Sequence, residues 1–136
     1  MRLGIVASRF NEEISGELLK RAKAQAEQLG AEVSVTSVPG ALEIPLALQW
    51  LAQLHSFDAL VAIGCVIRGE TYHFEIVANE SARGVTDVSL EFGVPIGNGI
   101  LTTEDEAQAR SRLDKGAEAV RAAVEMTRLK LRPRDA

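Results

Sequence analysis

The chain is poor in the residues that build cross-links and metal sites. Its 136 residues include one cysteine and two histidines. A single cysteine cannot form a disulfide within the chain, and it cannot supply a cysteine-based metal cluster. With only two histidines besides, a structural zinc site is not expected either. We therefore expect neither a disulfide scaffold nor a metal.

An excess of positive charge and a long apolar run are also missing. The formal net charge is −4, whereas nucleic-acid binders usually carry a basic face. No apolar run reaches the roughly 20 residues that span a membrane. The N-terminus leads into a strand pattern with no signal peptide before it. We expect a cytoplasmic protein that binds neither nucleic acid nor membrane.

What the chain does contain is typical of a globular α/β domain. Hydrophobic residues make up 46% and charged residues 25%, which does not favour disorder. The length suits one domain over residues 1–136. Strand patterns cover residues 3–7, 32–38, 59–67 and 94–101. Helical patterns run from an Asn11 cap to Gly30, over 42–54, from Thr71 towards Gly93, and over 104–113 and 115–131; the tail from Arg132 is expected to fray.

This alternation of strands and helices predicts a parallel sheet with helices on both faces. In such sheets a ligand binds beyond the carboxyl ends of the strands. Four segments follow strands or lie at their ends, and all are rich in polar or aromatic residues: 8–11, 38–43, 67–73 and 98–103. We therefore expect them to share one site.

Residues 64–75 are the most informative stretch, with the sequence GCVIRGETYHFE. The pattern turns from an apolar strand through a glycine corner into a helix opened by Thr71. Unbonded N–H groups at a helix start, together with the helix dipole, favour an anion such as phosphate. Thr71 with Glu70 either holds that anion or merely caps the helix. His73 either transfers protons or packs as an ordinary half-buried histidine, and its place at a strand end favours proton transfer.

Other candidates also have two interpretations. Phe10 either stacks on a flat ring or packs as a hydrophobic staple. Glu43 either binds a ligand or complements a helix dipole. Cationic side chains that could bind an anion, but that singly are more typical of a solvated surface, are Arg68, Arg110, Arg112 and Lys115. Cys65 and Trp50 are expected to pack in the core.

Four motif blocks together resemble one family, the 6,7-dimethyl-8-ribityllumazine synthases of riboflavin biosynthesis. They are SRFNEEI at 8–14, VPGALEIP at 38–45, GCVIRGETYHFE at 64–75 and PIGNGILTTEDEAQA at 95–109. Their order and approximate spacing match the family, and the resemblance extends over residues 3–131. Any one block alone is only moderately specific, whereas the combination is highly specific.

The resemblance implies a flavodoxin-like, three-layer α/β/α fold with a four-stranded parallel sheet. It also implies condensation of 5-amino-6-(D-ribitylamino)uracil with 3,4-dihydroxy-2-butanone 4-phosphate. An amine attacks the ketone to form an imine, phosphate leaves, and the ring closes with loss of water. The family uses no metal and no organic cofactor.

The resemblance also implies roles for individual residues. Phe10 would stack on the pyrimidine, Glu70 and Thr71 would hold the substrate phosphate, and His73 would transfer protons. The pyrimidine and ribityl pocket would further be lined by Ala41, Leu42, Glu43, Cys65, Val66 and Ile67.

Family sites form between neighbouring subunits of a pentamer, which implies a homo-oligomer here, either a pentamer or a multiple of pentamers. Asn98 would approach the pyrimidine, and Arg112 would bind the phosphate, from the adjacent subunit; Lys115 and Glu118 would assist. Asn98 stands where many members have an aromatic residue, so stacking on the ring would be one-sided. Riboflavin synthase is a further partner that the resemblance suggests.

Other functions on similar folds require residues of their own. A non-catalytic flavin- or lumazine-binding module on the same fold would keep Phe10 and the phosphate site without needing His73. A signalling receiver would need an acidic cluster after the first strand and an aspartate ending the third, where this chain has Ser8-Arg9 and Ile67-Arg68. A flavodoxin would need a glycine- and hydroxyl-rich phosphate loop after the first strand, which is missing. The receiver is therefore rejected and a flavodoxin is not expected.

Overall fold

The computed structural model describes residues 1–132. The fraying expected for the tail after Arg132 concerns residues outside this range. None of the helices within it has the length and apolar character needed to cross a membrane.

Four parallel strands form the central sheet, in the order β2-β1-β3-β4. They are β1 (Arg2–Ser8), β2 (Glu32–Val38), β3 (Ala59–Ile67) and β4 (Ile96–Thr103). β3 lies between β1 and β4 and is buried along nearly its whole length. A central strand covered on both faces explains its almost continuous apolar run. Both the parallel sheet and the central position of residues 59–67 are confirmed.

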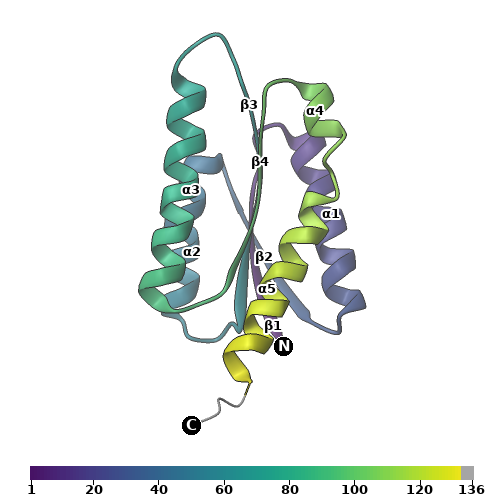
Figure 1. Ribbon diagram of the computed structural model, residues 1–136, viewed down its shortest axis with the longest axis vertical. Helices are drawn as coiled ribbons and strands as arrows, with labels where there is room; N and C mark the ends of the chain where they lie inside the picture. Colours follow the sequence, from purple (N-terminus) through teal and green to yellow (C-terminus); the bar gives the residue numbers. More distant parts are fainter. Residues whose placement is uncertain (133–136) are drawn as a thin grey trace.

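Helices cover both faces of the sheet, as Figure 1 shows. α1 (Glu12–Gln28), α4 (Glu106–Arg110) and α5 (Lys115–Leu131) lie on one face, and α2 (Ile44–Gln53) and α3 (His73–Phe92) on the other. A short 3-10 turn, η1 (Ala41–Glu43), precedes α2. Each face has its own apolar core, because β3 side chains alternate between them: Ile63 and Cys65 point to α1 and α5, Ala62 and Val66 to α2 and α3. The three-layer α/β/α architecture is therefore confirmed.

A glycine brings α3 close to α2. A Cβ placed on Gly84 would lie 2.6 Å from two side-chain carbons of Pro45. Glycine in a helix costs roughly 1 kcal/mol relative to alanine, and the close approach of the two helices explains why it is found here. α3 then ends at Gly93, whose φ of +62° is the left-handed conformation that glycine adopts easily.

Several local expectations were wrong. Trp50 is 59% exposed instead of packed in the core. Asn11 occupies the N-cap position of α1, but its side chain makes no capping hydrogen bond. α3 begins at His73, two residues later than expected, and α4 covers only Glu106–Arg110. α4 is shorter than expected because β4 continues to Thr103 and the backbone of Asp105 is still extended. Asp105 is the N-cap of α4, and its side chain accepts a hydrogen bond from the Gln108 backbone N–H.

Candidate active site

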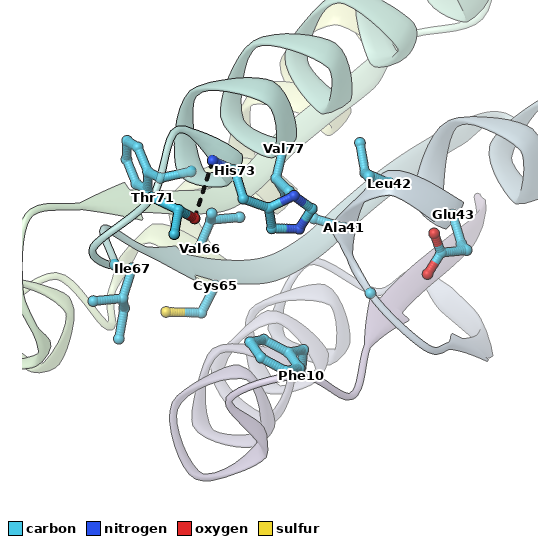
Figure 2. A pocket seen from close by; sticks show the side chains of 13 residues that line it. Phe10, Ala41, Leu42, Glu43, Cys65, Val66, Ile67, Thr71, His73 and Val77 are labelled. Atoms are coloured by element: carbon cyan, nitrogen blue, oxygen red, sulfur yellow. Dashed lines mark hydrogen bonds between the residues drawn. The ribbon is translucent and has the colours of Figure 1, made fainter.

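A pocket of about 330 Å³ opens at the carboxyl edge of the sheet. Its volume is in the range typical of small-molecule sites. The loops after β1, β2 and β3 and the first turns of α3 enclose it, as Figure 2 shows. The lining residues are Phe10, Gly40, Ala41, Leu42, Glu43, Cys65, Val66, Ile67, Gly69, Thr71, His73, Phe74 and Val77.

The structure brings together three of the four segments expected to share a site. Residues 98–103 are the exception, because they line a second pocket on the outer side of β4. β4 is an edge strand, and its side chains at 98 and 102 are exposed. Within a single chain, residues 98–103 therefore lie outside the first pocket.

Phe10 lies in the turn between β1 and α1 and is 70% exposed. A hydrophobic staple would need an apolar partner at the fourth helical position of α1, and that position is occupied by Ser15. Figure 2 shows the ring at the pocket, apart from the His73 imidazole. This geometry favours contact with a ligand over packing against the helix.

His73 is the first residue of α3 and its side chain is exposed. Figure 2 shows the imidazole directed into the pocket, towards Ala41. The Thr71 hydroxyl accepts a hydrogen bond from the His73 backbone N–H at 3.4 Å, within the turn that opens the helix. An accessible imidazole in a pocket can exchange protons with a bound molecule, which a histidine sealed in the core cannot do.

The loop before α3 carries unbonded donors. Within residues 1–132, the backbone N–H groups of Gly69, Glu70, Thr71 and Tyr72 make no hydrogen bond to protein. They stand at the N-terminus of a 20-residue helix, where the dipole also favours negative charge. Gly69 and Thr71 line the pocket, whereas Glu70 is exposed beside it.

Cys65 lines the pocket although it is almost fully buried. Its side chain is 2% exposed and packs in the core beneath α1 and α5. Burial, with a smaller contribution from the charge of Glu106, raises the pKa of the thiol to about 11, so the group stays protonated. The Cys65 carbonyl accepts a hydrogen bond from the Asn11 side-chain amide at 2.9 Å. This bond attaches the Phe10 turn to the end of β3, and the expected packing role of Cys65 is confirmed.

Four lining residues had not been singled out from the sequence: Gly40, Gly69, Phe74 and Val77. Val77 follows His73 by four residues, so the two share one face of α3. That spacing was a usable signal. Phe74 had none, because its place depends on how α3 leaves the loop.

The second pocket, of about 650 Å³, holds the remaining candidates: Asn98, Arg112, Lys115 and Glu118. The Asn98 side chain accepts a hydrogen bond from the Ile100 backbone N–H at 2.9 Å. Lys115 Nζ and Glu118 Oε1 lie 3.8 Å apart and form a long ion pair. The Arg112 guanidinium forms no ion pair within the described chain, and its one hydrogen bond there is the 3.4 Å bond that Nη1 donates to the Gln108 carbonyl. The guanidinium is therefore available to an anion.

The other two candidate anion-binding arginines are already paired with carboxylates. Arg68 contacts Glu75 and Glu104, and Arg110 contacts Glu13 and Glu106. In each case these carboxylates raise the pKa of the guanidinium. Neither arginine presents an uncompensated positive charge to a ligand.

Comparison with known proteins places the site in context. The family model described as 6,7-dimethyl-8-ribityllumazine synthase matches residues 1–131. A protein of that name from Nitrosomonas europaea is 57% identical over 133 residues, covering 95% of this chain and 81% of its own length. One from Cupriavidus necator is also 57% identical, over 134 residues, with 95% and 80% covered. One from Azoarcus sp. is 51% identical over 133 residues, with 95% and 85% covered.

The match spans all four motif blocks and every strand of the sheet, and identities above one half extend along almost the whole chain. The chain therefore belongs to the 6,7-dimethyl-8-ribityllumazine synthase family.

Proposed function

We propose that this protein condenses 5-amino-6-(D-ribitylamino)uracil with 3,4-dihydroxy-2-butanone 4-phosphate to form 6,7-dimethyl-8-ribityllumazine. The observation that carries the proposal is the pocket in which Phe10, His73 and the unbonded loop before α3 meet. Family membership supports the same reaction, because the relatives bear its name.

His73 is proposed to transfer protons between the reacting groups. The amine loses protons as it attacks the ketone, and the carbonyl oxygen leaves as water, so a group that both accepts and donates protons is useful. Phe10 stacks on the pyrimidine, which orients the amine towards the ketone. Holding two substrates in a reactive arrangement lowers the barrier further.

The substrate phosphate is proposed to bind at the start of α3. Thr71, the neighbouring N–H groups and the helix dipole favour the anion there. The residues that line this pocket include no lysine or arginine, and Glu43 adds a negative side chain. We propose that Arg112 of a neighbouring copy supplies the missing charge, because an arginine can bind phosphate through two charge-assisted hydrogen bonds.

A homopentamer follows as the proposed assembly, with each active site between two subunits. Asn98 of the neighbour would lie against the pyrimidine, and Lys115 and Glu118 would assist electrostatically. In the subunit's own pocket, the residues proposed to contact the pyrimidine and ribityl chain are Ala41, Leu42, Glu43, Cys65, Val66 and Ile67, with Glu70 beside the phosphate. Three expectations stay predictions: that residues 1–136 form a single domain, that the protein associates with riboflavin synthase, and that it is located in the cytoplasm.

The test is to mix the two substrates with the purified protein and follow the fluorescence of the lumazine product. The proposal expects product to form in proportion to the protein added. Tight binding of the pyrimidine with no product would contradict it, and would favour a non-catalytic binding module.

A further inference from the structure

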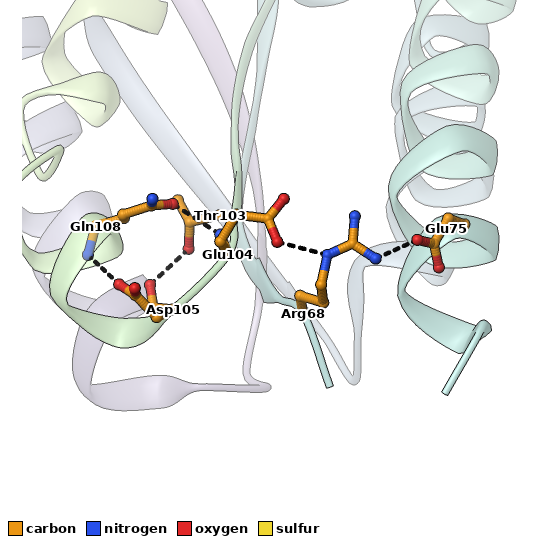
Figure 3. A network of polar contacts seen from close by, with 6 residues as sticks. All are labelled: Arg68, Glu75, Thr103, Glu104, Asp105 and Gln108. Carbon is orange, nitrogen blue, oxygen red and sulfur yellow. Dashed lines mark hydrogen bonds and ion pairs between the residues drawn. The ribbon is translucent and has the colours of Figure 1, made fainter. Parts of the chain in front are cut away.

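The side chain of Arg68 joins the loop after β4 to the first turn of α3 at the carboxyl edge of the sheet, as Figure 3 shows. Arg68 is the first residue after β3. Its Nε donates to Glu104 Oε2 at 2.6 Å, and Glu104 follows β4. Its Nη1 donates to Glu75 Oε1, in the first turn of α3. The guanidinium therefore spans from the end of β4 to the start of the helix that carries His73.

A third contact places this guanidinium against the pocket wall. Arg68 Cζ lies 4.5 Å from the centre of the Phe74 ring, an arrangement typical of a cation–π contact. Phe74 lines the pocket and follows His73 directly in the chain. Arg68 thus holds both residues that come immediately after His73.

The β4 side of this bridge is held in place by its own hydrogen bonds. The Glu104 N–H donates to the Gln108 side chain at 2.8 Å, and the Gln108 N–H donates to the Asp105 carboxylate at 2.8 Å. The Arg68 backbone N–H also donates to the Thr103 carbonyl at 2.9 Å. The loop on the other side is different, because the N–H groups of residues 69–72 make no hydrogen bond within residues 1–132. Within residues 1–132, the contacts that connect the first turns of α3 to the sheet are therefore the Arg68 bridge and the apolar packing of Phe74 and Val77.

We propose that Arg68 is a positioning residue for the reaction, which ties the first turn of α3 to the β4 end and so holds His73 at the substrates. This inference rests on the proposed function. Arg68 is not a ligand of the substrate phosphate, because a dianion approaching it would be repelled by the two carboxylates that already compensate its charge. It acts through the placement of the helix start, where a shift of 1 Å can cost about 10²-fold in rate.

The test compares Arg68→Gln with Arg83→Gln. Arg83 is a matched control because it also pairs with two carboxylates, Glu80 and Asp87, but all three lie on the exposed surface of α3. We expect Arg68→Gln to lower kcat by roughly tenfold while the KM for the butanone phosphate changes about twofold or less. Arg83→Gln should behave as the unchanged protein.

The carboxylate variants distinguish positioning from phosphate binding. Removing Glu75 or Glu104 breaks the bridge, so Glu75→Gln and Glu104→Gln should lower kcat in the same direction as Arg68→Gln. If Arg68 instead bound phosphate, these variants would free it and lower the KM for the phosphate substrate, while Arg68→Gln would mainly raise that KM. Either of those results overturns the proposal.

Hydrogen exchange supplies a readout that needs no turnover. The amides of Glu75 and Ile76 donate to the Tyr72 carbonyl in the first turn of α3. We expect them to exchange about tenfold faster or more in Arg68→Gln than in Arg83→Gln, because the turn opens more often. Equal exchange in the two variants contradicts the tie, whatever the activity. A protein without turnover but with this exchange difference would contradict the proposed function and leave the tie supported.

Discussion

Replacing Phe10 with alanine tests the binding side of the site. A phenylalanine side chain presents on the order of 200 Å² of surface, and 70% of Phe10 is exposed before a ligand binds. A pyrimidine stacked on one face would cover roughly half of the exposed part, about 70 Å², which at about 25 cal/mol per Å² is worth about 1.7 kcal/mol. Base–aromatic stacking measured by alanine substitution falls in the same range, about 1–3 kcal/mol.

The variant should therefore bind the pyrimidine substrate about tenfold to thirtyfold more weakly, since about 1.4 kcal/mol corresponds to a factor of ten. Calorimetric titration of the pyrimidine, without the second substrate, measures this Kd directly. Because the ring is exposed and packs against no staple partner, the free energy of unfolding without ligand should change by about 0.5 kcal/mol or less.

Tyr72→Ala provides the matched control. Tyr72 is 71% exposed and lies in the loop beside the pocket, but it does not line it. Its removal should leave the Kd for the pyrimidine unchanged. An unchanged Kd in Phe10→Ala, or an equal loss of pyrimidine affinity in both variants, would refute stacking. A large loss of stability in Phe10→Ala would instead support packing of Phe10 as a hydrophobic staple.

Three further changes address the phosphate site, the packing of the helices and the buried thiol. Arg112→Ala should raise the KM for the butanone phosphate by roughly 10- to 100-fold, because a charge-assisted hydrogen bond to the phosphate is lost. Arg110→Ala should leave this KM unchanged, because the Arg110 guanidinium is already paired with carboxylates. A rise confined to the KM for the pyrimidine would contradict the assignment of Arg112. Gly84→Ala should destabilise the protein by about 1–3 kcal/mol in urea unfolding, because the new Cβ overlaps a proline of α2. Gly16→Ala in α1 should instead stabilise it by about 0.5–1 kcal/mol, because nothing lies within 4 Å of the new Cβ. Equal effects of the two substitutions would refute the close packing of α3 on α2. Burial raises the pKa of Cys65 to about 11, so the folded protein retains a thiol proton that the unfolded chain releases from about pH 8.5 upwards. Between about pH 8.5 and pH 11 the free energy of unfolding should therefore fall more steeply in the unmodified protein than in Cys65→Ala. Parallel stability profiles in the two proteins would contradict this linkage.

Much of the fold was predictable because its strongest patterns are long and independent of context. The strands at 32–38 and 59–67 and the helix at 115–131 were predicted to the residue. Continuous burial produces the apolar run of β3, and a one-sided apolar stripe produces α5, so both patterns are visible in the sequence. The parallel sheet follows from the order of these patterns.

The errors arose where side chains met partners distant in the sequence. α4 is shortened because Asp105 starts it with a cap, and β4 extends to Thr103 because β3 continues beside it to Ile67. Trp50 follows the apolar pattern of α2 but ends up exposed. Apolar periodicity identifies a surface that can be buried, and it does not say whether the same chain buries it.

The site divides in a similar way. Phe10, Thr71 and His73 were predicted from their positions after strands, and the pocket does contain them. Residue patterns alone placed 98–103 in the same site as the other strand ends, whereas the resemblance assigned Asn98 to the site of an adjacent subunit; within one chain these residues line a separate pocket beside the edge strand β4. The pairing of Arg68 was missed because Glu104 is 36 residues away in sequence.

The central claim is that two copies of the chain complete one catalytic site. Its most direct test mixes His73→Ala with Arg112→Ala, unfolding and refolding them together at equal amounts. If each site takes His73 from one copy and Arg112 from the next, random assembly makes about a quarter of the sites intact, so the mixture should recover about a quarter of the unmodified activity. A mixture no more active than the average of its two components would contradict the account.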